Sequence, residues 1–211
     1  MRLIVARHGN TFEKGDVIRR VGARTDLPLT PEGKTQTRIL GEHLRETYGV
    51  PDTLITGELS RLEESTNEIA AAFTPSPPIL RDSRFNELDY GIHDGMEEEA
   101  FIHLVGKEQL EAWNTQAIPL KEWRLSREDL FQIWEDFSDE LKNGSLGSLV
   151  LVVTSNGIAR FAGGLTGDFS QFCKEHSLKL STGGYGVFAL TSEGTWEVEK
   201  WNIRPTPPQK K

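Results

Sequence analysis

Short apolar runs alternate with longer amphipathic segments along most of this chain. The runs predict strands at residues 2–6, 52–56, 149–153, 185–190 and 196–203. The run at 149–153 is the most apolar, which is typical of a strand covered on both faces. A turn of the sequence Ser-Glu-Gly-Thr joins the last two runs, so we expect them to lie antiparallel at the edge of the sheet.

Helices are predicted where apolar positions recur every three or four residues. In the clearest case Thr30 can cap the helix, Pro31 suits its first position and Gly49 ends it. The same spacing predicts further helices at residues 59–73, 97–113, 125–144 and 157–165. Strands and helices therefore alternate through much of the chain.

This alternation predicts an α/β protein with three layers, α/β/α. Its central sheet is expected to be mostly parallel, with an antiparallel edge strand and a helical insertion at about 92–145. The 211 residues fit one domain spanning 1–203, without internal repeats or a linker. Prolines and terminal lysines predict a disordered tail at 204–211.

Composition narrows the choice of partners and location. A formal net charge of −8 argues against nucleic acid or an acidic membrane as the main partner, and no apolar run approaches the ~18 residues of a membrane span. The single cysteine excludes an internal disulfide, and a cytoplasmic location is expected. The acidic chain nevertheless begins with a basic group that would suit a small anionic ligand, or an ordinary solvated surface: Arg7, Arg19, Arg20 and Arg24.

The first predicted strand ends in Arg7, His8, Gly9 and Asn10. Ligands of open α/β sheets bind beyond the carboxyl ends of the strands. Gly9 permits close backbone approach, and Arg7 and His8 would be costly to bury without polar partners. Taken alone, the pair is better explained by a solvent-exposed strand end.

Two later segments add charged residues. Arg61 falls in the first turns of the helix after the second strand, where free N–H groups attract anions and a guanidinium adds two donors. Glu87 precedes a loop punctuated by glycines. Each would be an ordinary surface residue by itself, and only their combination with Arg7 and His8 favours an anion site.

Four motifs link these residues: RHGNT at 7–11, DLPLTPEGKTQ at 26–36, TGELSRLEEST at 56–66 and FNELDYGIHDG at 85–95. In order and approximate spacing they resemble the histidine phosphatase superfamily, also called the phosphoglycerate mutase-like family. The resemblance spans residues 1 to about 165 and implies that family's fold. The second motif is more similar to the phosphatase branch than to the glycolytic mutases, which usually carry an aromatic residue just before the aspartate.

The resemblance implies a covalent mechanism on a small phosphorylated metabolite. His8 would take the phosphoryl group and water would later cleave the phosphohistidine. Arg7 and Arg61 would hold the non-bridging oxygens, with Asn10 as an added donor, and Glu87 would protonate the leaving oxygen. Such an arrangement suits phosphoryl transfer, which needs an in-line nucleophile and neutralised charge. No metal or cofactor is expected, because the guanidiniums supply the positive charge.

One position departs from the family pattern. Where the resemblance implies a second histidine after the strand at 149–153, the chain has Ser155, and a shift of one residue would put Asn156 there. Loss of one preorganised donor costs on the order of 10²–10³ in rate. Ser155 or Asn156 can still donate a neutral hydrogen bond, so we expect reduced or retuned activity. His93 is an alternative source of an imidazole, although its loop position does not fix its direction.

Other functions remain open at this stage. Loss of the histidine motivates a catalytically inactive phosphate-binding pseudoenzyme, although the retained nucleophile and acid argue against it. A phosphoglycerate mutase-like phosphotransferase is the lesser alternative. Arg20 and Arg24 suggest a second anionic group on the substrate, with a solvated surface as the competing explanation. The tryptophans of the helical insertion suit either the core or a homodimer interface.

Overall fold

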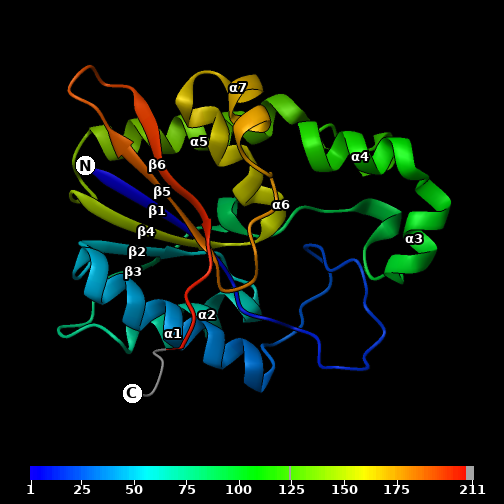
Figure 1. Ribbon diagram of the computed structural model, residues 1–211, viewed down its shortest axis with the longest axis horizontal. Coiled ribbons are helices and arrows are strands. Elements are labelled where there is room, and N and C mark those ends of the chain that lie inside the picture. Colours follow the sequence, from blue (N-terminus) through cyan, green and yellow to red (C-terminus); the bar gives the residue numbers. More distant parts are fainter. Residues whose placement is uncertain (124, 208–211) are drawn as a thin grey trace.

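A six-stranded sheet runs through the centre of the molecule in the order β3-β2-β4-β1-β5-β6 (Figure 1). The computed structural model describes residues 1–123 and 125–207. The strands are β1 (Arg2–Arg7), β2 (Thr53–Thr56), β3 (Ile79–Arg81), β4 (Leu149–Thr154), β5 (Tyr185–Leu190) and β6 (Trp196–Ile203). Strands β3, β2, β4 and β1 are parallel, whereas β5 is antiparallel to β1 and to β6. The prediction of a mostly parallel sheet with an antiparallel edge is confirmed.

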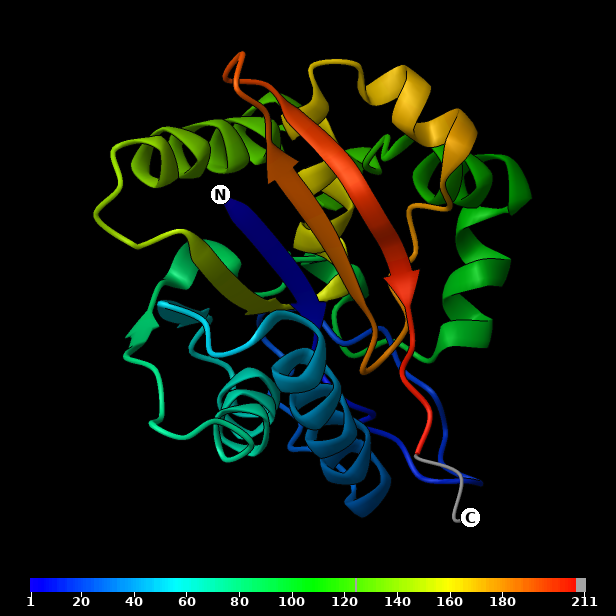
Figure 2. The same ribbon diagram turned by 60° about the vertical axis from the view of Figure 1, so that its left-hand side comes forward.

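Helices cover both faces of the sheet (Figures 1 and 2). Below it in Figure 1 lie α1 (Pro31–Tyr48) and α2 (Ser60–Ala70). The other face carries α5 (Arg127–Lys142), α6 (Asn156–Ala159), η4 (Arg160–Thr166) and α7 (Phe169–Glu175). The remaining helical segments are η1 (Ser83–Phe85), η2 (Gly91–His93), α3 (Glu98–Val105), α4 (Lys107–Gln116) and η3 (Lys121–Trp123). The three-layer α/β/α architecture is thus the one the sequence predicted.

The caps of α1 explain why this helix begins and ends where the sequence indicated. Thr30 accepts a hydrogen bond from the Gly33 N–H at 3.0 Å, which satisfies a backbone donor that a helix start leaves free. Pro31 occupies the first turn, and Gly49 ends the helix with φ 86°. Both limits of α1 are therefore set by the residues at its two ends.

Two predicted helices are interrupted in the structure. The segment 97–113 is split into α3 and α4, because Gly106 adopts φ 82° and cannot continue an α-helix. The segment 157–165 begins as the short α6 and continues as the 3-10 helix η4. Neither β3 nor α7 was predicted.

Two clusters of apolar side chains, one on each face, hold the sheet between its helices. Along β1, Leu3 and Val5 enter the cluster on the α5 side, and Ile4 and Ala6 enter the cluster on the α1 side. Strand β4 alternates in the same way, and Arg7 pairs with Thr154 in its register. His8 and Ser155 follow this last pair, and the His8 N–H donates to Thr154 O.

The helical insertion contributes to the core. Its tryptophans, Trp113, Trp123 and Trp134, are fully buried within the large cluster, so they give no support to a homodimer interface. None of the helices within the described ranges is long and apolar enough to cross a membrane. Of the predicted disordered tail, residues 208–211 lie outside the described residues.

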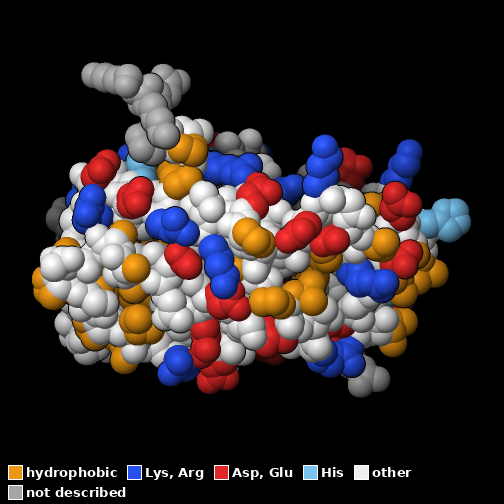
Figure 3. All heavy atoms as spheres, turned by 90° about the horizontal axis from the view of Figure 1, so that it is seen from below, with side chains coloured by type: hydrophobic (Ala, Val, Ile, Leu, Met, Phe, Trp, Pro, Cys, Tyr) orange, Lys and Arg blue, Asp and Glu red, His pale blue; other side chains and the backbone are white. Residues whose placement is uncertain are grey.

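Acidic and basic side chains are interspersed over the face seen in Figure 3. The net charge of −8 is therefore not gathered into one patch on that face.

Candidate active site

A cavity of about 220 Å³ opens beyond the carboxyl ends of β1 and β4. Most of the site residues predicted from the sequence line it: Arg7, His8, Asn10, Arg20, Arg61, Glu87 and Asn156. They come from the end of β1 and the loop that follows it, from the first turn of α2, from the segment after η1 and from the start of α6. The fold thus brings widely separated segments together beyond the carboxyl ends of the strands, where ligands of open α/β sheets bind.

His8 lines this cavity and is almost completely buried. It is 5% exposed, and its Nδ1 lies 2.7 Å from the Gly9 carbonyl. Because a carbonyl oxygen only accepts, Nδ1 carries the proton and Nε2 keeps its lone pair. Burial, followed by the charges of Arg7 and Arg61, holds the pKa of His8 well below its ordinary value of 6.5. At neutral pH the imidazole is therefore uncharged and nucleophilic at Nε2.

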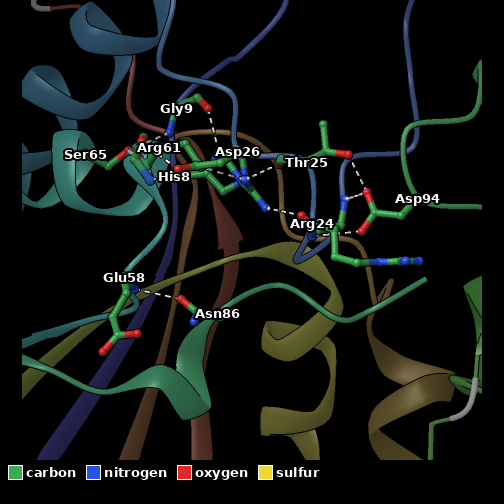
Figure 4. A network of polar contacts seen from close by, with 12 residues as sticks. His8, Gly9, Arg24, Thr25, Asp26, Glu58, Arg61, Ser65, Asn86 and Asp94 are labelled. Atoms are coloured by element: carbon green, nitrogen blue, oxygen red, sulfur yellow. Dashed lines mark hydrogen bonds and ion pairs between the residues drawn. The ribbon is translucent and has the colours of Figure 1, made fainter. Parts of the chain in front are cut away.

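The backbone around His8 is tied to both neighbouring elements. The His8 N–H donates to Thr154 O of β4 at 3.1 Å, and the Gly9 N–H donates to Ser65 Oγ of α2 at 3.1 Å. Ser65 Oγ in turn donates to Arg61 O at 2.7 Å (Figure 4). A Cβ at position 9 would overlap the Gly33 carbonyl of α1, so glycine is required for this close approach.

Arg61 is a buried cation and Arg7 a half-buried one, and both line the same cavity. Arg61 donates to Thr25 O at 3.0 Å and to Gly22 O at 3.2 Å, and Asp26 lies 3.9 Å away (Figure 4). Arg7 donates to Leu180 O at 2.8 Å, and its Nε is buried without a partner among the described residues. Burial lowers the pKa of both guanidiniums, which remain charged because an arginine does not deprotonate in proteins. Each keeps N–H groups for an anion.

Glu87 enters the cavity from the segment after η1. Thr154 Oγ1 donates to Phe85 O at 2.7 Å, which ties that segment to the end of β4. The Glu87 carboxylate accepts from the Leu88 N–H at 2.9 Å and from the Gly157 N–H at 3.3 Å. A Cβ on residue 157 would overlap the Glu87 carboxylate, so this glycine leaves the acid its place.

Ser155 and Asn156 take different positions at the end of β4. Ser155 follows Thr154, whose carbonyl accepts from the His8 N–H, and Ser155 Oγ is buried without a hydrogen-bond partner in the described part of the chain. Ser155 does not line the cavity, whereas Asn156 does. Asn156 Oδ1 accepts from the Leu180 N–H at 2.8 Å, which leaves its Nδ2 as a donor toward the cavity. No histidine occupies either position.

Of the two arginines predicted for the substrate region, only Arg20 lines the cavity. It pairs with Glu98 at 2.5 Å and lies over the ring of Phe101. Arg24 does not line the cavity. Its side chain is 58% exposed, pairs with Asp89 at 3.1 Å and points away from His8 and Arg61 (Figure 4).

His93 does not supply the missing imidazole. It is buried outside the cavity, where its Nδ1 accepts a hydrogen bond from Trp123 Nε1 at 3.0 Å and its ring packs against Phe101. Across the described ranges, no three His, Cys, Asp or Glu side chains are grouped so that they could hold a metal ion.

Sequence reasoning missed two residues of the cavity wall. Arg160 is 4% exposed and lines the cavity beside Tyr90, which is also buried. Burial raises the pKa of Tyr90, so its hydroxyl stays protonated. The sequence could have indicated Arg160 through its spacing from Asn156. The two are four residues apart, and residues four apart lie on the same side of a helix.

Comparisons with known proteins agree with the geometry. The sequence model of the histidine phosphatase superfamily (branch 1) matches residues 3–204. A 2,3-bisphosphoglycerate-dependent phosphoglycerate mutase of Leifsonia xyli is 31% identical over 113 residues, which are 53% of this chain and 44% of that protein. Across the curated relatives named first, the match covers only about half of each relative's length.

Solved structures share the fold at lower identity. The mycobacterial glucosyl-3-phosphoglycerate phosphatase has a TM-score of 0.79 at 19% identity, over 96% of this chain and 98% of that one. A phosphoserine phosphatase of Entamoeba histolytica, solved with 3-phosphoglyceric acid, has a TM-score of 0.75 at 19% identity, over 96% of each chain. At such identities the similarity demonstrates a common fold.

Proposed function

The chain belongs to the histidine phosphatase superfamily, and from this premise we propose that it is a phosphomonoesterase that works through a phosphohistidine at His8. Membership in a superfamily of phosphatases and mutases makes phosphoryl transfer the kind of chemistry to expect. The observation that carries the proposal is that the buried, uncharged His8 shares one cavity with the guanidiniums of Arg7 and Arg61. The substrate is a small phosphorylated molecule, since the cavity has only about 220 Å³.

In the first half of the proposed reaction the phosphoryl group moves to His8. Arg7 and Arg61 bind the non-bridging oxygens and neutralise the charge that develops on them. The Nε2 lone pair attacks phosphorus, and the bond to the leaving oxygen breaks. Glu87, in its acid form, gives that oxygen its proton and becomes a carboxylate.

In the second half water cleaves the phosphohistidine. The Glu87 carboxylate takes a proton from water, the oxygen attacks phosphorus, and the N–P bond breaks with its electron pair returning to Nε2. Inorganic phosphate leaves, and both catalytic residues regain their starting states. The Gly157 N–H holds the carboxylate in place through both halves.

Activity is expected to be lower than in an enzyme with a second imidazole. The Nδ2 group of Asn156 offers a neutral donor toward the cavity, which Ser155 does not line, and a neutral donor is weaker than a charged one. Removing one preorganised donor costs about 10²–10³ in rate, which still leaves a large acceleration over the uncatalysed reaction.

A single comparison tests the proposal. The purified protein is incubated with a ³²P-labelled alkyl phosphate, and acid-labile label on the protein and released phosphate are measured. We expect both, and both should be lost in His8→Ala and kept in His103→Ala, because His103 is exposed and outside the cavity. Tight phosphate binding without label or turnover would instead identify a pseudoenzyme.

The curated relatives make transfer to an acceptor other than water the second candidate. Those named first are phosphoglycerate mutases, and they match only half of this chain. Adding 3-phosphoglycerate to the labelled protein separates the two functions. Label that appears in a bisphosphorylated product indicates a mutase, and label that appears only in inorganic phosphate indicates a phosphatase.

A further inference from the structure

The lining of the cavity is not charged throughout. Three apolar side chains from the loop that follows β1 also line it: Phe12, Ile18 and Val21. We call these three residues the apolar wall. Phe12 and Val21 are half-buried, and Ile18 is 48% exposed although it lines the same cavity as His8. Apolar surface is therefore open in the cavity that contains the phosphate-binding guanidiniums.

The apolar wall is held in place through its backbone. The Glu98 N–H, at the start of α3, donates to Ile18 O at 2.9 Å. The Asn10 side chain, which also lines the cavity, donates to Phe12 O at 2.8 Å. The exposure of Ile18 is thus a feature of an anchored segment. A ligand in the cavity can cover this surface without any movement of the loop.

The cations of the same segment already have their anions. Arg20 pairs with Glu98 at 2.5 Å, and its guanidinium lies over the ring of Phe101. Arg19 pairs with Glu97 at 3.4 Å. The two ion pairs carry no net charge, and an anionic group on the substrate would have to displace a carboxylate to reach either arginine.

We propose that the apolar wall binds the body of an uncharged leaving group, so that the preferred substrates are phosphomonoesters of apolar alcohols. This inference rests on the proposed function, because the same cavity has to bind the phosphoryl group. Covering apolar surface is favourable in proportion to the area removed from water. A carboxylate placed against the wall would lose hydration and gain no unpaired cation from that segment.

A series of alkyl phosphates tests the inference by binding alone. The probes are ethyl, propyl, butyl and pentyl phosphate, and calorimetry with the His8→Ala protein measures their affinities without turnover. Each methylene group that the wall covers should tighten binding about threefold. We expect 4-carboxybutyl phosphate, which has the same number of carbon atoms as pentyl phosphate, to bind about tenfold more weakly than pentyl phosphate.

Two substitutions in the wall, each added to His8→Ala, locate the alkyl chain. Ile18→Asn should flatten the dependence of affinity on chain length, because a polar amide replaces apolar surface. Val21→Thr keeps the shape of the side chain and should lower the gain per methylene, which tests the wall even if Ile18→Asn does not fold. Ile118→Asn is the matched control, since Ile118 is 43% exposed and lies outside the cavity, so the dependence should stay.

The remaining outcomes decide between the alternatives. Affinities that do not rise from ethyl to pentyl phosphate, or a rise that survives both Ile18→Asn and Val21→Thr, would overturn the inference and leave the proposed phosphatase intact. Tighter binding of 4-carboxybutyl phosphate than of pentyl phosphate would also refute it, because the leaving group would then be anionic. If no ester binds, the phosphate site itself is wrong, and the proposed function fails with it.

Discussion

At the scale of single residues, the site depends on how burial sets the protonation of His8. The Gly9 carbonyl holds the proton on Nδ1, and burial disfavours a second proton on Nε2. The charges of Arg7 and Arg61 act in the same direction. Burial that would be costly for an isolated histidine thus keeps this one in its nucleophilic form.

We expect the acid limb of the pH profile to reflect this depressed pKa. Protonation of Nε2 would abolish attack on phosphorus, and the pKa of His8 lies well below 6.5, so phosphoenzyme formation should not be halved at pH 6.5. The measurement is the rate of labelling at pH 4.5–8, together with the ¹⁵N shifts of the His8 ring. A His8 titration centred near pH 6.5 would contradict the prediction.

Ser155 gives a second prediction at this scale. It directly follows Thr154, whose carbonyl accepts from the His8 N–H, so we expect an imidazole at this position to reach the phosphoryl group. We expect Ser155→His to raise the turnover of a simple alkyl phosphate by about tenfold or more, given the cost of a missing donor.

Asn156→His is the paired variant. It removes the acceptor that holds Leu180, whose carbonyl in turn binds Arg7, so we expect slower turnover. Should Asn156→His accelerate the reaction while Ser155→His does not, Asn156 would be the position equivalent to the family histidine.

At the scale of elements, the sequence predicted those segments whose limits are set by local chemistry. The Thr30 cap and the Gly49 stop of α1 are examples, because both act through neighbours within a few residues. Strand β3 was missed because its three residues are exposed and show no alternation. The helix predicted at 97–113 includes Gly106, whose positive φ of 82° interrupts it.

The short helix α6 carries a prediction about Glu87. In Gly157→Ala the new Cβ would collide with the Glu87 carboxylate and the Leu88 side chain, and would displace the acid. Loss of a general acid costs about 10²–10⁴ in rate when the leaving group is poor. We therefore expect a large loss of kcat for an alkyl phosphate and a much smaller loss for p-nitrophenyl phosphate, whose leaving group needs no proton.

Gly164→Ala controls for a general disturbance of that segment. Its Cβ would contact the Phe131 side chain, away from the cavity. Equal losses for both substrates in Gly157→Ala, as expected of a merely destabilised protein, would contradict the role assigned to Glu87.

At the scale of the whole molecule, the cavity is lined by segments that lie far apart in the sequence. Residues 18–20 pair with residues 95–98 through backbone hydrogen bonds, which bring Arg20 over the site. The sequence predicted His8, Arg7, Arg61 and Glu87 as a group, because strand ends and motif order suffice for them. It did not show that the Arg24 side chain pairs with Asp89 outside the cavity, and it missed Arg160, whose Nη1 donates to Trp113 O, because both contacts join distant segments or depend on loop conformation.

Asp94 is the residue through which this distant loop supports the phosphate site. Its carboxylate accepts from the N–H groups of Gly22 at 3.2 Å and Arg24 at 3.0 Å, and from the Thr25 hydroxyl. The carbonyls of Gly22 and Thr25 in turn accept from Arg61. Without Asp94 the loop loses its anchor, and Arg61 loses the carbonyls that orient it.

We expect Asp94→Ala to weaken phosphate binding about tenfold and to lower the free energy of unfolding by about 1–3 kcal/mol, as for loss of a hydrogen-bonded carboxylate. The measurements are the inhibition constant of inorganic phosphate and denaturant unfolding. Asp89→Ala is the control, since it breaks an exposed ion pair with Arg24 in the same region and should cost below about 1 kcal/mol. If the Asp94→Ala protein were less stable but bound phosphate normally, the prediction would be contradicted. Arg61 would then be oriented by its own helix, independently of the loop that Asp94 anchors.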